Sequence, residues 1–212
     1  MLGQSRMKQL QGNILEIHEV FPNYYDKIKE FSGTLTFDDG LYSQYMFLKN
    51  NPDLCSRSIV FVSPSCIRDN NISPIKQIVL CDLAHIMHNK LNDNSAYMSL
   101  NEIQELKSLG TKIGYHGYYH YCFLNKNLSS VVLKTIDNEV QKCLDFQSKF
   151  NIFDNIFCAP YNDYKFLNFY IKSFEHKTNQ EFAYVRNRIS FEELNNLYIN
   201  NRYMHLIEPN LK

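Results

Sequence analysis

The chain has 212 residues, of which 44% are hydrophobic and 21% charged, values that are ordinary for a globular protein. We therefore expect one domain over residues 1–212. The 22 basic and 22 acidic residues cancel, and the lack of a basic excess argues against a nucleic-acid partner. No stretch has the length of a membrane span or the apolar core of a signal peptide, so we expect a cytoplasmic location. The six cysteines form no CxxC pair and are expected as free thiols.

Short apolar runs alternate along the chain with longer amphipathic ones. The clearest helix start is Ser99-Leu-Asn-Glu102, a capping box, and Gly110 follows where a left-handed cap is expected. The periodicity predicts further helices and several strands. In chain order, we expect strands at 33–37, 58–62, 111–115, 156–159, 182–185 and 203–207, and helices at 42–49, 75–89, 131–150 and 164–173.

Strands that alternate with helices indicate a parallel sheet with helical crossovers. Such folds place their chemistry at the carboxyl ends of the strands. Three polar clusters fit that rule, because each directly follows an expected strand. These are Asp38-Asp39-Gly40, His116, and Pro160-Tyr161.

The segment Thr36-Phe-Asp-Asp-Gly40 places two carboxylates at one strand end. Adjacent strand side chains point in opposite directions, but a turn at Gly40 can bring both into one pocket. One carboxylate can then bind a metal while the other acts as a base. The alternative is a solvated turn, because Asp and Gly also favour turns.

The segment His116-Gly-Tyr-Tyr-His120 spaces two histidines at i and i+4, so both rings share one face if it is helical. The spacing alone is weak evidence, but the segment follows a strand directly. Two histidines and one carboxylate leave an open metal position, as catalytic sites do.

The remaining histidines are less informative. His85 and His88 are expected on the surface or in the core, and His18 and His176 have no partner nearby in sequence. His205 lies in an apolar run, where a structural and a catalytic role both remain open.

Together, Thr36–Gly40 and His116–His120 resemble the first two motifs of the polysaccharide deacetylase (NodB-homology) family of carbohydrate esterases. Phe157-Cys-Ala-Pro-Tyr161 resembles its third motif, and His205 its fifth. The resemblance is patchy, in order, and covers roughly residues 33–205. It implies a distorted (β/α) barrel with fewer than eight regular repeats.

The resemblance also implies the roles of the site residues. Asp39, His116 and His120 would bind one divalent ion, for which zinc is the first expectation and cobalt, nickel and iron also suit the ligands. Asp38 would be the general base, the N–H of Tyr161 the oxyanion donor, and His205 the general acid.

The chain also departs from the family pattern. Cys158 stands where the family has an arginine that orients the base, Asn162 replaces the closing glycine, and there is no Trp. Arg186, Arg188 and Arg202 are the candidates to replace the missing arginine.

The first functional hypothesis is therefore a metal-dependent hydrolase that removes an acetyl or formyl group from an amino sugar. Its expected substrate is a nucleotide-linked or lipid-linked precursor of a surface glycan. The alternatives are a non-catalytic carbohydrate-binding relative that keeps the metal, favoured by Cys158, and a metal-dependent hydrolase of another C–N bond, such as a cyclic amide. The sequence does not fix the oligomeric state.

Overall fold

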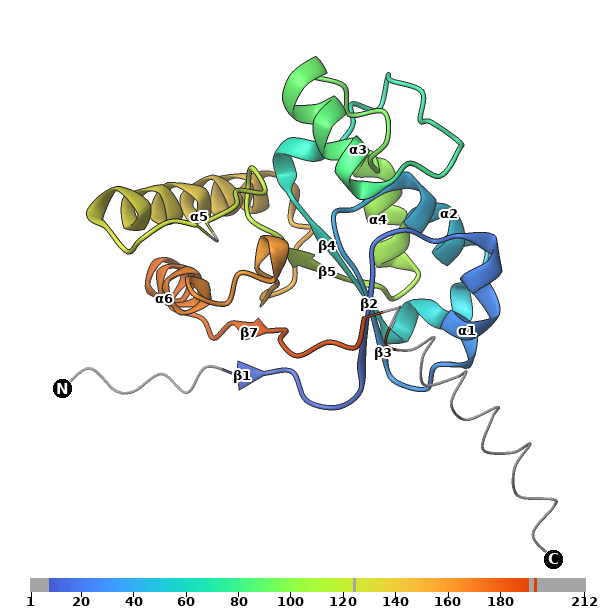
Figure 1. Ribbon diagram of the computed structural model, residues 1–212, viewed down its shortest axis with the longest axis horizontal. Coiled ribbons are helices and arrows are strands. Elements are labelled where there is room, and N and C mark those ends of the chain that lie inside the picture. Colours follow the sequence, from blue (N-terminus) through green and yellow to red (C-terminus); the bar gives the residue numbers. More distant parts are fainter. Residues whose placement is uncertain (1–7, 124, 191–192, 194–212) are drawn as a thin grey trace, which may run out of the picture.

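The computed structural model describes residues 8–123, 125–190 and 193. One sheet of seven parallel strands lies at its centre (Figure 1). The strands are β1 Lys8–Gln9, β2 Ile14–Ile17, β3 Thr34–Phe37, β4 Ser58–Val62, β5 Lys112–Tyr115, β6 Ile156–Phe157 and β7 Ala183–Tyr184. The expected parallel α/β sheet is confirmed.

The sheet is strongly curled. Its strand order is β1-β7-β6-β5-β4-β3-β2, yet Leu15 of β2 also forms a parallel bridge with Ile189, which follows β7. The N–H of Glu16 donates to the Ile189 carbonyl at 2.9 Å, and the Ile189 N–H donates to the Ile14 carbonyl at 2.8 Å. These contacts bring the end of the sheet back to β2 and give a curled half-barrel.

Helices cover the outside of the curled sheet. In Figure 1, α1, α2 and α4 lie to one side of the strands, and α5 and α6 to the other. No helix within the described residues is long and apolar enough to span a bilayer. The helices are α1 Tyr25–Glu30, α2 Tyr42–Lys49, α3 Cys81–Ile86, the π-helix η4 Met87–Leu91, α4 Leu100–Ser108, α5 Ser130–Phe150 and α6 Leu167–Thr178; 3₁₀ turns lie at Pro22–Tyr24, Pro52–Arg57, Pro64–Cys66 and Pro160–Asn162.

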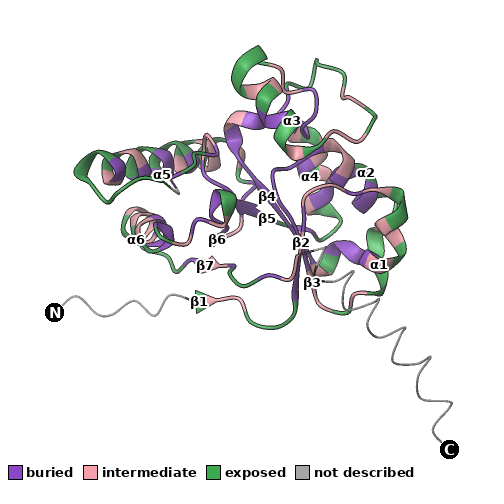
Figure 2. Ribbon diagram, in the orientation of Figure 1, coloured by how far each residue is buried: buried purple, intermediate pink, exposed green. Residues whose placement is uncertain are grey.

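Alternation along the strands separates two apolar clusters. On β4, Val60 and Val62 belong to the large cluster, whereas Ile59 and Phe61 belong to a small one that also contains Ile14 and Cys158. The small cluster joins residues of β2, β4 and β6, which are not neighbours in the sheet, so it fills the inside of the curl. Strands β2 to β6 are largely buried, whereas β1 and β7 at the other end of the sheet are partly exposed (Figure 2).

Two expected features of α4 are confirmed. The Ser99 hydroxyl accepts from the Glu102 N–H at 3.4 Å, and a Glu102 carboxylate oxygen accepts from the Ser99 N–H at 2.7 Å. Gly110 follows the helix at φ 100°, in the left-handed region that favours glycine. All six cysteines are free, as expected.

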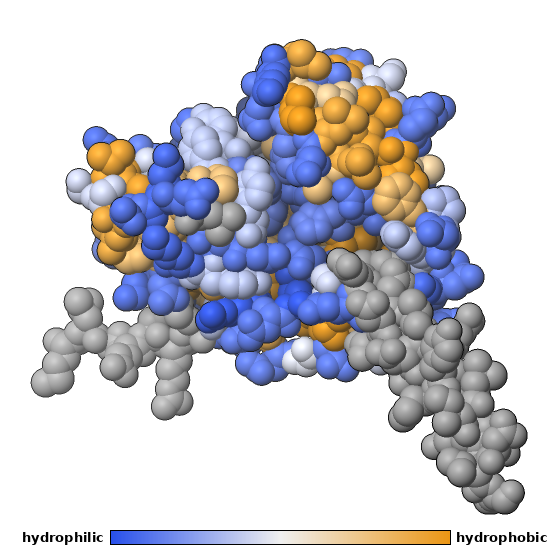
Figure 3. Space-filling view, viewed as in Figure 1, coloured by the Kyte–Doolittle hydropathy of each residue, from blue (hydrophilic) through white to orange (hydrophobic). Residues whose placement is uncertain are grey.

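The helix expected over residues 75–89 is wrong in extent. It is limited to α3 and η4, and it leaves Leu83 and Ile86 49% and 47% exposed while Ala84 and His85 are buried. Figure 3 shows apolar surface over this region. The buried face of α3 is the one that carries His85, which makes a polar contact with Asp39.

Strands β1 and β2 were not expected from the sequence. The expected strand at 203–207, with His205, lies outside the described residues.

Candidate metal and hydrolytic site

The two carboxylates of the Asp pair separate at a tight turn after β3. Asp39 adopts φ 76° and Gly40 φ 74°, a conformation that is costly for a non-glycine residue and is common at functional sites. Asp38 and Asp39 are 2% and 3% exposed, so the alternative of a solvated turn is wrong. Asp38 ion-pairs with Arg188, whereas Asp39 hydrogen-bonds to His85 and His120.

His116 and His120 meet at Asp39 through a loop. The Nε2 of His120 lies 3.0 Å, and that of His116 3.6 Å, from Asp39 Oδ1. The segment is not helical, which corrects the i, i+4 interpretation: Gly117 has φ 74° and His120 φ 55°. Buried Glu139 of α5 accepts hydrogen bonds at 2.8 and 3.1 Å from the N–H groups of the two tyrosines between the histidines, and so holds the turn.

His85 is a site residue that the sequence analysis missed. It is 8% exposed, its Nε2 lies 3.1 Å from Asp39 Oδ1, and its ring stacks on His120 at a centroid distance of 4.1 Å. The Tyr97 hydroxyl lies 2.9 Å from its Nδ1. If Nδ1 accepts from Tyr97, Nε2 carries the proton and donates to Asp39. No spacing rule links positions 39 and 85, so the sequence offered no signal.

The electrostatics of the cluster keep Asp39 ionised and His116 neutral. Burial by itself raises the pKa of Asp39, but hydrogen bonds to His120 and His85 outweigh it and hold the pKa well below its ordinary value. Burial lowers the pKa of His116 to about 4. An ionised carboxylate and a neutral imidazole are the forms that bind a metal.

The donor set of this cluster fits a divalent ion. Asp39, His116 and His120 each offer one ligand atom, and these atoms lie within 4.8 Å of one another. The Nδ1 of His116 lies 3.0 Å from the Cys158 carbonyl, which orients the ring and leaves Nε2 facing Asp39. Such a contact is typical of metal-binding histidines.

Arg188 occupies the position opposite Asp38. Its Nη1 lies 2.5 Å from Asp38 Oδ1, and its Nη2 donates at 2.7 Å to Asp38 Oδ2 and at 2.6 Å to Glu16 Oε1. Burial raises the pKa of Asp38, but the charge and hydrogen bonds of Arg188, together with His116, outweigh it and leave the pKa below its ordinary value. Of the three candidate arginines, Arg188 is therefore the one that contacts Asp38.

The other two candidates are not placed there. Arg186 lies over the Tyr164 ring, and Arg202 is outside the described residues. Cys158 Sγ lies 3.8 Å from Asp38 Oδ2. Burial raises the pKa of the Cys158 thiol well above its ordinary value, so it is neutral.

The turn after β6 faces the same cluster. The Tyr161 ring packs 4.7 Å from the His120 ring. Tyr161 has φ 57°, and within the described residues no backbone or side-chain group accepts from its N–H. Asn162 adopts φ 54°, which asparagine tolerates better than most residues, and its side-chain amide bonds both Glu16 and Arg188. This explains how asparagine replaces glycine here.

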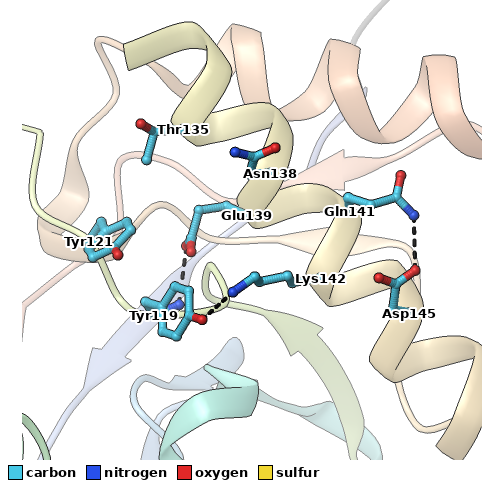
Figure 4. A pocket seen from close by; sticks show the side chains of 8 residues that line it. All are labelled: Tyr119, Tyr121, Thr135, Asn138, Glu139, Gln141, Lys142 and Asp145. Atoms are coloured by element: carbon cyan, nitrogen blue, oxygen red, sulfur yellow. Dashed lines mark hydrogen bonds between the residues drawn. The ribbon is translucent and has the colours of Figure 1, made fainter. Parts of the chain in front are cut away.

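A shallow groove lies on the other side of the His116–His120 loop (Figure 4). It encloses about 500 Å³ between the loop and α5. Its lining residues are Tyr119, Tyr121, Thr135, Asn138, Glu139, Gln141, Lys142 and Asp145. No aspartate or histidine of the metal cluster lines it, so the groove is separate from that cluster.

No protein-family model and no curated protein matches the chain. Among solved structures, the deacetylase PplD of Streptococcus pyogenes, in complex with acetate, is similar with a TM-score of 0.47 and 14% identity. The match covers 89% of this chain and 98% of that chain. Similarity at this level assigns no activity to the present chain.

Proposed function

We propose that this chain is a metal-dependent hydrolase that removes an acetyl or formyl group from the nitrogen of an amino sugar. The proposal rests on one observation: Asp39, His116 and His120 converge beside a second, arginine-paired carboxylate at the same edge of the sheet. Two imidazoles and a carboxylate suit zinc, and cobalt, nickel and iron also fit. The ion would polarise the acyl oxygen and lower the pKa of a water molecule that it binds.

Asp38 is the general base in this proposal. Its lowered pKa keeps it ionised at neutral pH, and Arg188 fixes both of its oxygens. The N–H of Tyr161 would stabilise the negative charge that develops on the acyl oxygen. The resemblance assigns protonation of the leaving amine to His205.

The substrate class comes from the sequence resemblance. It implies a carbohydrate amide, and we expect a nucleotide-linked or lipid-linked precursor of a surface glycan in the cytoplasm. Residues 1–212 would form one catalytic domain, a distorted (β/α) barrel with fewer than eight regular repeats. The curled sheet supports this. Arg188 beside Asp38 weighs against the non-catalytic alternative, which rested on Cys158.

The test is a panel of N-acetyl and N-formyl sugars, nucleotide sugars and cyclic amides incubated with metal-loaded protein. Mass spectrometry follows the free acid and the new amine. We expect release from sugars that disappears in His116→Ala and persists in His88→Ala, because His88 bonds Asn94 rather than Asp39. Binding without release would favour the non-catalytic relative, and release from cyclic amides alone would favour another C–N hydrolase.

A further inference from the structure

One histidine beside Asp38 has no role in the metal cluster. His18 directly follows β2, and its Nε2 lies 3.9 Å from Asp38 Oδ2 and 3.9 Å from Glu16 Oε1. Its side chain is 37% exposed, whereas that of Asp38 is 2% exposed. His18 therefore adjoins the candidate base and is also accessible to solvent.

The backbone fixes the separation of His18 and Asp38. The side-chain amide nitrogen of Gln44, which is fully buried, donates to the backbone carbonyls of both residues, at 2.7 Å and 2.5 Å. Side chains alternate between the two faces along β2 and β3. Ile17 and Phe37 belong to the large apolar cluster on the outside of the curl. The neighbouring residues Glu16, His18 and Asp38 therefore point to its inner face. The pair is thus preorganised by two strands and one helix.

The other histidines of the described chain are engaged elsewhere. His85 and His120 contact Asp39, and His116 is a candidate ligand that also bonds a carbonyl. His88 bonds Asn94, and His176 lies on α6 near Asp137. His18 is the histidine of the described residues that adjoins the base and remains available for proton transfer.

The Glu16–His18–Asp38 group also has the spacing of a cation site. Arg188 already fills that position, because its guanidinium bonds Glu16 and Asp38 at 2.6 Å and 2.5 Å. A second cation there would face the buried positive charge of Arg188. A proton carrier fits this group better than a metal.

The charged groups around His18 favour its protonated form. Burial by itself lowers its pKa and Arg188 also lowers it, but the carboxylates of Asp38, Asp39 and Glu16 outweigh both, and the pKa lies above its ordinary value. A histidine that is protonated near neutral pH is suited to donate a proton there.

We infer that His18 is the general acid of the proposed deacylation and donates its Nε2 proton to the departing amine. Water oxygen bonds to the acyl carbon while Asp38 takes one water proton. The C–N bond then breaks, its electron pair goes to nitrogen, and nitrogen takes the His18 proton. Transfer of the proton from Asp38 to His18 restores both groups, and the products are a carboxylic acid and an amine.

This inference rests on the proposed function. It is tested by comparing how the loss of His18 affects substrates with different leaving groups. An amide needs a proton on its leaving nitrogen, whereas 4-nitrophenolate leaves without one. We therefore compare His18→Gln with wild type on 4-nitroacetanilide, on the fastest N-acetyl sugar of the panel, and on 4-nitrophenyl acetate. We expect a loss of roughly 10²–10⁴-fold on both amides, little change on the ester, and unchanged metal content. His176→Gln, changed at an exposed residue of α6, is the matched control and should lose neither activity. His205→Gln is measured beside it, because the resemblance gives His205 the same role.

The outcomes separate the two hypotheses. Equal losses on amide and ester in His18→Gln, or no loss on either, would refute the role of His18 while wild-type activity upholds the proposed function. Selective amide loss in His205→Gln instead would assign the proton to His205. A wild type that hydrolyses no amide would refute the proposed function and this inference with it.

Discussion

At the scale of single residues, the site depends on how two neighbouring aspartates divide their contacts. Asp38 bonds Arg188 through both oxygens, while Asp39 faces His120 and His85. The left-handed backbone of Asp39 turns the second carboxylate away from the first. This geometry favours Asp39 as the ligand and Asp38 as the base.

The first prediction tests that division. Asp38→Asn should retain the metal and lose roughly 10²–10⁴-fold in turnover, because general-base catalysis has that magnitude. Asp39→Asn should lose the metal. Elemental analysis and kinetics on the same preparations measure both effects. Metal loss in Asp38→Asn would show that the roles are exchanged.

The second prediction concerns the buried pair of Arg188 and Asp38. Arg188→Met leaves the Asp38 carboxylate buried without its partner, and removing one partner of such a pair costs about 3–5 kcal/mol. Urea unfolding at pH 7 measures the loss. Arg186→Met is the control, since Arg186 is exposed. Because the folded pKa of Asp38 is lowered, the wild-type advantage over Arg188→Met should be full at neutral pH and shrink as the pH falls through that pKa. An advantage that grows on acidification would contradict the pairing.

At the scale of elements, the orientation of α3 follows a polar contact, between His85 and Asp39, rather than the burial of its apolar side chains. The helix buries His85 against Asp39 and leaves Leu83 and Ile86 exposed. A ligating carboxylate is commonly held by a further hydrogen bond of this kind, which tunes metal affinity. In our proposal α3 therefore contributes to the metal site without supplying a ligand.

The third prediction follows for His85. His85→Ala should weaken metal binding by about 10–100-fold, and Tyr97→Phe by less, because Tyr97 acts only through the His85 ring. Competition with a chelator measures the dissociation constants, and His88→Ala is the control. The visible spectrum of Co²⁺-loaded His85→Gln should show the same metal coordination number as the wild type. Unchanged affinity in His85→Ala would contradict this role.

At the scale of the whole molecule, the proposed ion would tie the loop after β3 to the loop after β5. A ligand that binds the folded state alone at 100 times its dissociation constant adds about 2.7 kcal/mol of stability. For a chain of this size, that corresponds to a rise in Tm of roughly 5–10 °C.

The fourth prediction is that chelation lowers the Tm of the wild type by this amount and that zinc restores it. His120→Ala should show no metal-dependent shift, whereas His176→Ala, changed at an exposed residue of α6, should keep it. Differential scanning calorimetry with and without chelator decides the point. A shift that survives in His120→Ala would place the ion elsewhere.

The sequence by itself determined the parallel sheet and which motifs lie at its carboxyl edge. Alternating strands and helices, the Ser99 cap and the positions of Asp38, Asp39 and His116 directly after strands are local properties of the chain. Only the tertiary structure decided that Arg188 pairs with Asp38, 150 positions away, and that His85 turns inward. Both depend on which segments meet when the sheet curls back to β2, and local periodicity holds no information about contacts at that separation.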